Sequence, residues 1–320
     1  MAMAFYAISG IDICGAVEKS ISEKNRKDWI EWVYAQQVVP SWDVNSEEKP
    51  DGASWGAFGF RGSPSSGRPF NPNQTTAEFW HHDTSHMAMT YTALLTLVIL
   101  GDDLSRVNRE AIIQALKHCQ TESGSFIASV DGAESDMRFL FAACAISYIL
   151  NDFRGVNTDR AVTYILKSRT YENAHGGSTY CAVASLALLG QLHVIDEFRL
   201  ELIGWLLKRQ QDDGGFAGRP GKVSDTCYSF WVGASLEILG AYQFSDSQAN
   251  RKFLETTVSS RGGFSKHADA NPDPLHSYMG LAGLSIAKEP GLEPLWPQLN
   301  ITLRALNHLK NGTKWWTMSQ

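Results

Sequence analysis

Several features that often decide a protein's class are scarce or absent in this chain of 320 residues. Cysteine occurs five times, an odd number, at Cys14, Cys119, Cys144, Cys181 and Cys227. Disulfide scaffolds are small and cysteine-dense, so we expect free thiols and a reducing compartment. No apolar run approaches the ~20 residues of a membrane span, and no basic segment precedes an apolar one at the start. These absences predict a soluble, cytoplasmic protein without stable membrane insertion.

Basic residues are in the minority, with 28 Lys and Arg against 34 Asp and Glu, which gives a formal net charge of −6. This balance argues against nucleic acid as the main partner. The short signatures of P-loops, nucleophile elbows and dinucleotide sites are missing. There is also no Asp-Asp-x-x-Asp motif, so no carboxylate clamp for Mg²⁺ and a diphosphate is predicted. Apolar residues make up 43% of the chain, enough for a sizeable core.

What the sequence does have is repetition. Glycine turns recur before apolar stretches, at Gly124-Ser-Phe126, Gly176-Gly-Ser178, Gly214-Gly-Phe216 and Gly262-Gly-Phe264, at intervals of 52, 38 and 48 residues. Such periods indicate a repeated supersecondary unit. Apolar helices are predicted at 136–150, 178–192, 224–242 and 275–287, and amphipathic helices at 108–120, 158–169, 198–211 and 246–260. Strand signals are almost absent.

Alternating buried and amphipathic helices predict an all-α fold with two helix layers, as an open solenoid or a closed α/α barrel. The N-termini of the inner helices would meet at one rim, where helix dipoles favour anions. The segment 40–82 is irregular and rich in Pro and Gly. Its aromatic residues predict a loop packed on the body rather than a disordered linker; they are Trp42, Trp55, Phe58, Phe60, Phe70 and Trp80.

Three residues could bind a metal ion. Asp225 and Cys227 lie two apart at a predicted helix start, and we expect His276 to occupy the matching place one repeat later. Asp, Cys and His are all zinc ligands, and three protein ligands leave one coordination position open, as catalytic zinc requires. The alternative is an N-cap at Asp225, a buried small residue at Cys227 and a hydrogen-bonded polar group at His276.

Four cationic residues adjoin the glycine turns: His175, Arg219, Lys222 and Lys266. On one rim they would form a pocket for a phosphate or diphosphate. The alternative is an ordinary solvated basic surface, because lysine is usually exposed.

These residues belong to stretches that resemble the β subunit of the protein prenyltransferases, most closely geranylgeranyltransferase type I. The matching stretches are 8–12, 60–63, 86–92, 97–108, 136–139, 175–179, 218–222 and 225–234. The resemblance implies one α/α-barrel domain over 1–320, with about six helix pairs, the first truncated at the N-terminus, around an apolar funnel. It also implies a prenyltransferase α subunit as the heterodimer partner.

The resemblance further implies an activity. A geranylgeranyl group would pass from geranylgeranyl diphosphate to the cysteine of a C-terminal CaaX box, with X mainly Leu or Phe, in proteins such as Rho-type GTPases. Asp225, Cys227 and His276 would bind one zinc ion per β subunit. Lys266 would act in catalysis where farnesyltransferase has a Mg²⁺-binding aspartate, so Mg²⁺ would not be required.

By the same resemblance, further residues would bind substrates. His175, Arg219, Lys222 and Tyr228 would contact the diphosphate, and Trp231, Phe141 and Tyr91 would line the lipid funnel. His86, Glu134, Arg138 and Phe139 would bind the peptide, the first three through water at its terminal carboxylate. For Phe139 and Phe141 the alternative is a core aromatic, and for Glu134 and Arg138 an i,i+4 ion pair.

Small differences favour type I within the family: Thr226 between the predicted ligands, where farnesyltransferase has Gly, and the small Ala2, which leaves room for a fourth isoprene unit. One departure is a shortened segment before His175. The alternative function is therefore a non-catalytic or farnesyl-specific subunit that binds an α subunit or lipid. A terpene cyclase shares the barrel architecture but would need an Asp-x-Asp-Asp motif, which is absent.

Overall fold

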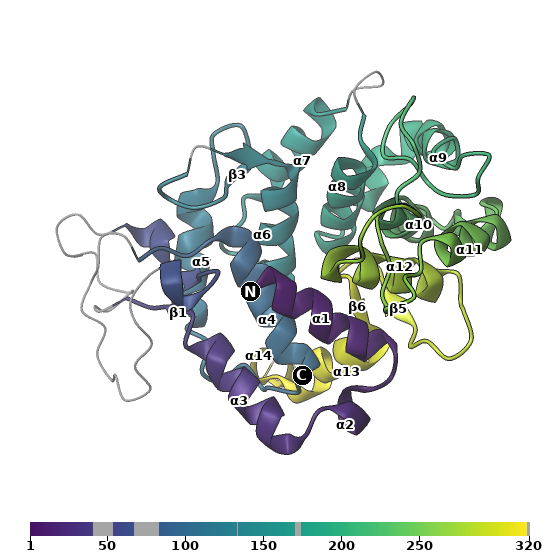
Figure 1. Cartoon of the computed structure of the whole chain (residues 1–320). Coiled ribbons are helices and arrows are strands. Elements are labelled where there is room, and N and C mark those ends of the chain that lie inside the picture. Colours follow the sequence, from purple (N-terminus) through teal and green to yellow (C-terminus); the bar gives the residue numbers. More distant parts are fainter. Residues whose placement is uncertain (41–53, 67–82, 133, 170–173, 319–320) are drawn as a thin grey trace. The chain divides into compact units, whose positions relative to one another are not determined.

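The computed structural model describes residues 1–40, 54–66, 83–132, 134–169 and 174–318 (Figure 1). These ranges are mainly helical, and they form two compact units. Unit 1 comprises residues 1–5, 19–167 and 307–320, and unit 2 comprises residues 6–18 and 168–306. Helices α1 (Ala2–Ile13), α2 (Val17–Ser20) and α13 (Leu303–Gly312) contribute to both units. No described helix is long and apolar enough to cross a membrane.

Unit 1 is built around two apolar helices that pack against each other, α4 (Met87–Ile99) and α6 (Met137–Ile149). Both are buried along most of their length because their sequences are apolar on every face. The amphipathic helices are α3 (Glu23–Tyr34), α5 (Arg109–Cys119) and α7 (Thr158–Lys167), with the short α14 (Lys314–Thr317) near the C-terminus. Antiparallel two-residue strands join the loops: β1 (Gln37–Val38) pairs with β2 (Gly59–Phe60), and β3 (Phe126–Ile127) with β4 (Ser135–Asp136).

Unit 2 repeats this scheme with three apolar helices: α8 (Gly176–Leu188), α10 (Thr226–Ile238) and α12 (Pro274–Ile286). Helix α10 packs against both α8 and α12, and the three lie side by side in Figure 1. The amphipathic partners are α9 (Arg199–Leu207) and α11 (Ser247–Thr256). Strands β5 (Leu295–Trp296) and β6 (Ile301–Thr302) pair after α12, and the short 3-10 helices η3 (Leu192–Phe198) and η4 (Tyr242–Phe244) follow α8 and α10.

The eight predicted helices are all present, with shifted ends. Predicted helix 178–192 begins at Gly176 and ends at Leu188, and predicted helix 224–242 ends at Ile238. Each is closed by a glycine in the left-handed region, Gly190 (φ 68°) and Gly240 (φ 70°). Glycine adopts this conformation without the steric cost of a Cβ, so it stops a helix sharply.

The apolar helices share one internal register. Each begins after a residue whose side chain caps the helix by accepting a backbone N–H bond; these N-caps are His86, Asp136, His175, Asp225 and Asp273. Five residues further on, each helix carries a buried aromatic: Tyr91, Phe141, Tyr180, Phe230 and Tyr278. The caps satisfy N–H groups that a helix start leaves unpaired, and the aromatics fill the core. The repeat therefore appears in the residue types at two positions of each apolar helix, as well as in the spacing of the helices.

A glutamine joins consecutive repeats in each unit. In unit 2 the Gln210 side chain donates to the carbonyls of Gly214 (3.0 Å) and Asp246 (2.8 Å), and accepts from the N–H of Asp246 (2.9 Å). In unit 1 Gln120 makes the same set with Gly124 and Asn157. Each glutamine thus ties a glycine turn to the start of the next amphipathic helix.

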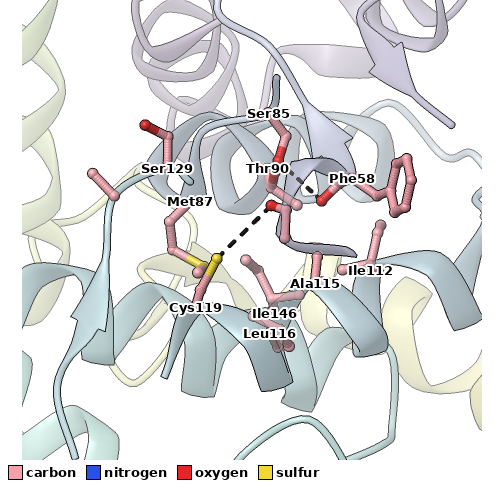
Figure 2. Close-up of a pocket in the computed structure, with 12 residues that line it drawn as sticks. Phe58, Ser85, Met87, Thr90, Ile112, Ala115, Leu116, Cys119, Ser129 and Ile146 are labelled. Atoms are coloured by element: carbon pink, nitrogen blue, oxygen red, sulfur yellow. Dashed lines mark hydrogen bonds between the residues drawn. The ribbon is translucent and has the colours of Figure 1, made fainter. Parts of the chain in front are cut away.

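The irregular segment 40–82 is described only at 54–66, so Trp42, Phe70 and Trp80 lie outside the described residues. In the described part, Phe58 and Phe60 are buried and Trp55 packs against α5. Figure 2 shows the small cavity beneath this segment, where Ser85 donates to the carbonyl of Phe58 (2.9 Å). Its volume is about 10 Å³, at most one water molecule, so it is a packing gap and no substrate site.

Candidate active site

The three predicted metal ligands converge in unit 2. One donor atom each from Asp225, Cys227 and His276 lie within 4.8 Å of one another. Asp225 and Cys227 are 7% and 9% exposed. The Nε2 atom of His276 lies 3.4 Å from Oδ1 of Asp225. The helix N-termini of α10 and α12 therefore bring a carboxylate, a thiol and an imidazole together, a donor set that fits zinc.

The alternative role given for Asp225, an N-cap, is present: its side chain caps α10 and accepts the N–H of Cys227 (3.0 Å). The expectation that His276 matches these ligands in the next repeat is wrong. The residue in register with Asp225 is Asp273, and His276 follows it by three residues inside α12. The offset arises because Asp273 is the cap of α12, which places His276 one turn in, where its ring reaches Asp225.

Asp273 was not singled out from the sequence. Its Oδ1 accepts the N–H of His276 (2.9 Å), and its Oδ2 lies 2.6 Å from Nδ1 of the same residue. The second contact fixes the imidazole with Nε2 toward Asp225. A metal-binding histidine commonly donates its other ring N–H to a carboxylate, which sets its tautomer and orientation. The signal in the sequence is Asp273-Pro274, an N-cap followed by proline at the first helical position.

Burial and the contacts among the three side chains shift the pKa values of this cluster. Burial, followed by the charge of Asp225, raises the pKa of the Cys227 thiol far above its usual value. Burial alone would raise the pKa of Asp225, but hydrogen bonds from His276 and Cys227 hold it below its ordinary range. The hydrogen bond to Asp225 raises the pKa of His276, against the opposing effect of burial. Lys266 adds a cation, with Nζ 3.6 Å from Oδ2 of Asp225.

The predicted anion-binding residues adjoin this cluster. His175 caps α8, its Nδ1 accepting the N–H of Gly177 (3.2 Å), and its Nε2 lies 2.8 Å from the hydroxyl of Tyr228. Burial, then the charge of Arg219, lowers the pKa of His175, so its imidazole is neutral at pH 7. Burial also raises the pKa of Tyr228 to about 12, with smaller effects of Cys227 and Asp225.

The glycine turn beside these residues has a structural reason. A Cβ on Gly218 would lie 2.3 Å from Cζ of Tyr228, and the Gly218 carbonyl accepts the N–H of Gly176 (2.7 Å). Gly218 therefore lets the turn carrying Arg219 approach α10 and α8 closely. Arg219 and Lys222 are both exposed. Trp231 contacts the rings of Tyr180 and Phe230.

Tyr6 is a further neighbour that sequence reasoning missed. Burial, and then the proximity of Cys227, raises the pKa of its phenol, and its ring lies 6.0 Å from that of Tyr278. Tyr6 borders an open hollow of about 350 Å³, which is also lined by Asp273 and Tyr278. Nothing in the local sequence of α1 distinguishes Tyr6 from a core aromatic, so no signal could have found it.

The predicted peptide-binding residues lie in unit 1, as do Tyr91 and Phe141, which were predicted to line the lipid funnel. The ring of His86 lies 5.7 Å from that of Phe139, and Tyr91 lies 5.4 Å from Phe141, both edge to face. All three aromatics are buried, with exposed fractions of 4% to 8%. Burial lowers the pKa of His86, and its Nδ1 accepts the N–H of Ala88.

The ion pair given as the alternative for Glu134 and Arg138 is present, and both side chains are about 60% exposed. Arg138 also binds Asp136 (2.6 Å), the N-cap of α6, which the sequence interpretation did not include.

Comparison with known proteins places these observations in context. A family model described as a prenyltransferase alpha-alpha toroid domain matches residues 1–301. A Dictyostelium discoideum protein named geranylgeranyl transferase type-1 subunit beta is 39% identical over 323 residues, covering 95% of this chain and 88% of that protein. The Arabidopsis thaliana protein of the same name is 38% identical, covering 95% and 82%.

Among solved structures, one chain of Candida albicans protein geranylgeranyltransferase-I complexed with GGPP aligns with a TM-score of 0.79. The sequence identity is 24%, and the alignment covers 98% of this chain and 91% of that one. At this identity the likeness concerns the fold.

Proposed function

The chain belongs to the prenyltransferase alpha-alpha toroid family, as a β subunit of the geranylgeranyltransferase type I kind, a transferase, and we propose that with an α subunit it transfers geranylgeranyl groups to CaaX cysteines. The predicted α/α toroid and the family resemblance are confirmed by this membership. Geranylgeranyl diphosphate is the proposed donor, and Rho-type GTPases are proposed acceptors. The proposed location is the cytoplasm.

One observation carries the proposal: the Asp225, Cys227 and His276 cluster lies beside the contact between His175 and Tyr228. Tyr228 follows Cys227 directly on α10, so a metal site and an anion site share one helix start. A reaction between a thiol and a diphosphate ester needs both sites next to each other. A metal site or a basic surface alone would not require this arrangement.

The proposed zinc ligands are Asp225, Cys227 and His276. Zinc bound there would lower the pKa of a coordinated substrate thiol and so supply a thiolate near neutral pH. The chain prepares the site: Asp273 binds Nδ1 of His276 and so directs Nε2 toward Asp225, where both would meet the metal. Asp225 is kept ionised by its hydrogen bonds. The donor set and its carboxylate-bound histidine fit the proposed metal.

In the proposed diphosphate site, the positions of the protons on His175 and Tyr228 decide which group can donate to a phosphate oxygen. Because Nδ1 of His175 accepts the N–H of Gly177, the neutral ring carries its proton on Nε2. That proton is donated to the hydroxyl oxygen of Tyr228, which leaves the tyrosine O–H free to donate to a phosphate oxygen. Arg219, Lys222 and Lys266 would add positive charge where negative charge develops on the leaving group. Trp231 would contact the lipid.

In unit 1, we propose that Tyr91 and Phe141 contact the lipid and Phe139 the peptide. His86, Glu134 and Arg138 would hold the terminal carboxylate of the peptide through water. The exposed ion pair between Glu134 and Arg138 leaves guanidinium N–H groups available to solvent and so to a bridging water. The buried aromatics of α4 and α6 support these side chains.

The proposal is tested with the heterodimer. The chain is coexpressed with a matching α subunit, and zinc per heterodimer is measured. Geranylgeranyl and farnesyl diphosphates are then offered with a CaaX peptide ending in Leu. The expected result is about one zinc and preference for the longer lipid. Preference for farnesyl, or a zinc-loaded heterodimer without transfer, would contradict the proposal and favour the farnesyl-specific or non-catalytic alternative.

Asp273 gives a second prediction within this site. Asp273→Ser keeps a cap for α12 but removes the carboxylate from Nδ1 of His276. We expect zinc affinity to fall about 10- to 100-fold, because the imidazole loses its orienting partner. Competition with a chelator of known zinc affinity measures the change.

The matched control is Asp246→Ser, which alters the N-cap of α11 in the same way. It should leave zinc affinity unchanged while costing similar stability. Equal zinc loss in the two variants would show that Asp273 acts through helix stability alone.

A further inference from the structure

The side chain of Lys266 lies near Asp225 although about half of it is exposed to solvent. Its ammonium group lies 3.6 Å from the Asp225 carboxylate, and the lysine side chain is 52% exposed. An exposed ion pair contributes little net stability, and ordering a long lysine side chain costs rotamer entropy. The attraction to Asp225 is therefore too weak to place Lys266 by itself, and the main chain must do so.

The main chain at Lys266 is fixed by one residue of α10, Thr226, through its backbone and its side chain. The hydroxyl of Thr226 donates to the carbonyl of Ser265 (2.7 Å), and its backbone N–H donates to the carbonyl of Lys266 (3.0 Å). One residue thus binds two consecutive carbonyls, those of Lys266 and of the residue before it. Thr226 is fully buried and Ser265 is 2% exposed. Buried hydrogen bonds of this kind are costly to lose, because the freed carbonyl is not solvated.

Neighbouring contacts explain why this attachment is stiff. The N–H of Ser265 donates to the carbonyl of Thr257 (2.9 Å), and its hydroxyl donates to the carbonyl of His267 (2.7 Å). Thr226 is the first residue of α10, whose N–H has no partner within the helix, and the Lys266 carbonyl satisfies it. The loop and the helix start therefore complete each other's hydrogen bonds.

We propose that Thr226 is a positioning residue that fixes the main chain of Lys266, so that the ammonium group stays beside Asp225 at the edge of the metal site. Thr226 lies between the two proposed ligands Asp225 and Cys227. It thereby links the helix start that carries the metal donors to the loop that carries the cation. The inference rests on the proposed function, in which Lys266 stabilises the leaving group.

The test uses the heterodimer and three variants. Thr226→Val removes the hydroxyl and keeps the shape, Thr226→Ser keeps the hydroxyl, and Thr96→Val removes an equally buried hydroxyl that donates to the carbonyl of Thr92 within helix α4 of unit 1. We expect kcat to fall about tenfold in Thr226→Val, the effect of one buried hydrogen bond. Thr226→Ser should stay within about twofold of the unaltered chain, and Thr96→Val should retain its kcat per folded heterodimer.

A double-mutant cycle separates positioning from general destabilisation. In a Lys266→Ala background, Thr226→Val should change kcat by less than about twofold, because the residue it positions is gone. If the effects of the two substitutions on kcat are independent of each other, or if Thr96→Val lowers kcat as much as Thr226→Val, the proposal is overturned.

A second measurement does not depend on transfer. The rate at which acetic anhydride acetylates Lys266, followed by mass spectrometry, should rise at least about twofold in Thr226→Val and stay unchanged in Thr96→Val. An unchanged rate in Thr226→Val would contradict the positioning role. An inactive unaltered heterodimer in which this rate still responds would instead count against the proposed function.

Discussion

Replacing Cys227 with alanine should lower kcat at least about 10³-fold and remove most of the zinc from the heterodimer. The reason is that only two of the three proposed donors remain. Burial and the charge of Asp225 raise the pKa of the Cys227 thiol, so it is protonated when no metal is bound. Metal binding must displace that proton, and zinc affinity should accordingly rise with pH. Zinc content and single-turnover transfer, measured across pH 6 to 8, check both statements.

Cys144 offers the matched control for this substitution. It is a cysteine outside any disulfide, and it is fully buried in the apolar helix α6 of unit 1. Cys144→Ala removes the same sulfur from a core and should cost some stability through the space left behind. It should retain about one zinc and normal transfer. A Cys227→Ala heterodimer that still binds zinc and transfers lipid at the normal rate would refute the assignment of the metal site.

The helices could be predicted because their signals are local. Apolar periodicity and glycine turns gave the eight predicted helices to within a few residues, and the family match confirms the toroid fold class. Errors occurred at the ends. The sequence pattern continues past residue 188 in apolar residues, whereas the helix stops where Gly190 takes a positive φ. Whether a glycine will adopt that conformation depends on the packing after the helix, which composition does not reveal.

The site was predictable in its residue types but not in its register. Spacing suggested that His276 occupies the place in the next repeat that matches the helix start at Asp225 and Cys227, whereas the N-cap there is Asp273. The two aspartates are both N-caps, but only Asp225 belongs to the group of three donor atoms that lie within 4.8 Å of one another. The carboxylate oxygens of an aspartate can cap a helix or bind a metal ion, so a sequence pattern cannot distinguish the two roles. The packing of α12 against α10 makes the difference.

Residues that act through others carried signals of helix capping at most, and none of the positioning contact itself. Thr226 was noticed only for its place between two ligands, and its contact with the loop at Ser265 spans 39 residues. Asp136 and Asp273 are polar residues before apolar helices, which on sequence alone are ordinary caps. Their additional partners, Arg138 and His276, are set by side-chain orientation within the first turn. Such positioning contacts depend on how the folded helices and loops are arranged, so the sequence alone does not predict them.

Replacing Lys266 with alanine should lower kcat about 100-fold, the usual effect of removing one fixed charge that stabilises a transition state. The KM for the diphosphate should change less, because Arg219, Lys222, His175 and Tyr228 remain to bind it. The unaltered heterodimer should turn over without Mg²⁺, since the ammonium group already supplies a cation beside Asp225. Steady-state rates with and without Mg²⁺, at saturating zinc, measure these effects.

Lys252 on α11 is the control, because it is an exposed lysine on an amphipathic helix of the same unit. Lys252→Ala should leave kcat within about twofold, as surface substitutions usually do. Lys266→Arg keeps a positive charge but not its compact shape, so it should recover only part of the lost rate. If the unaltered heterodimer required Mg²⁺, the site would need an added cation beside its carboxylates. The ammonium group of Lys266 would then not supply the catalytic charge that is proposed for it. If Lys266→Ala kept full activity without Mg²⁺, the leaving group would be stabilised by Arg219, Lys222 and Tyr228 alone.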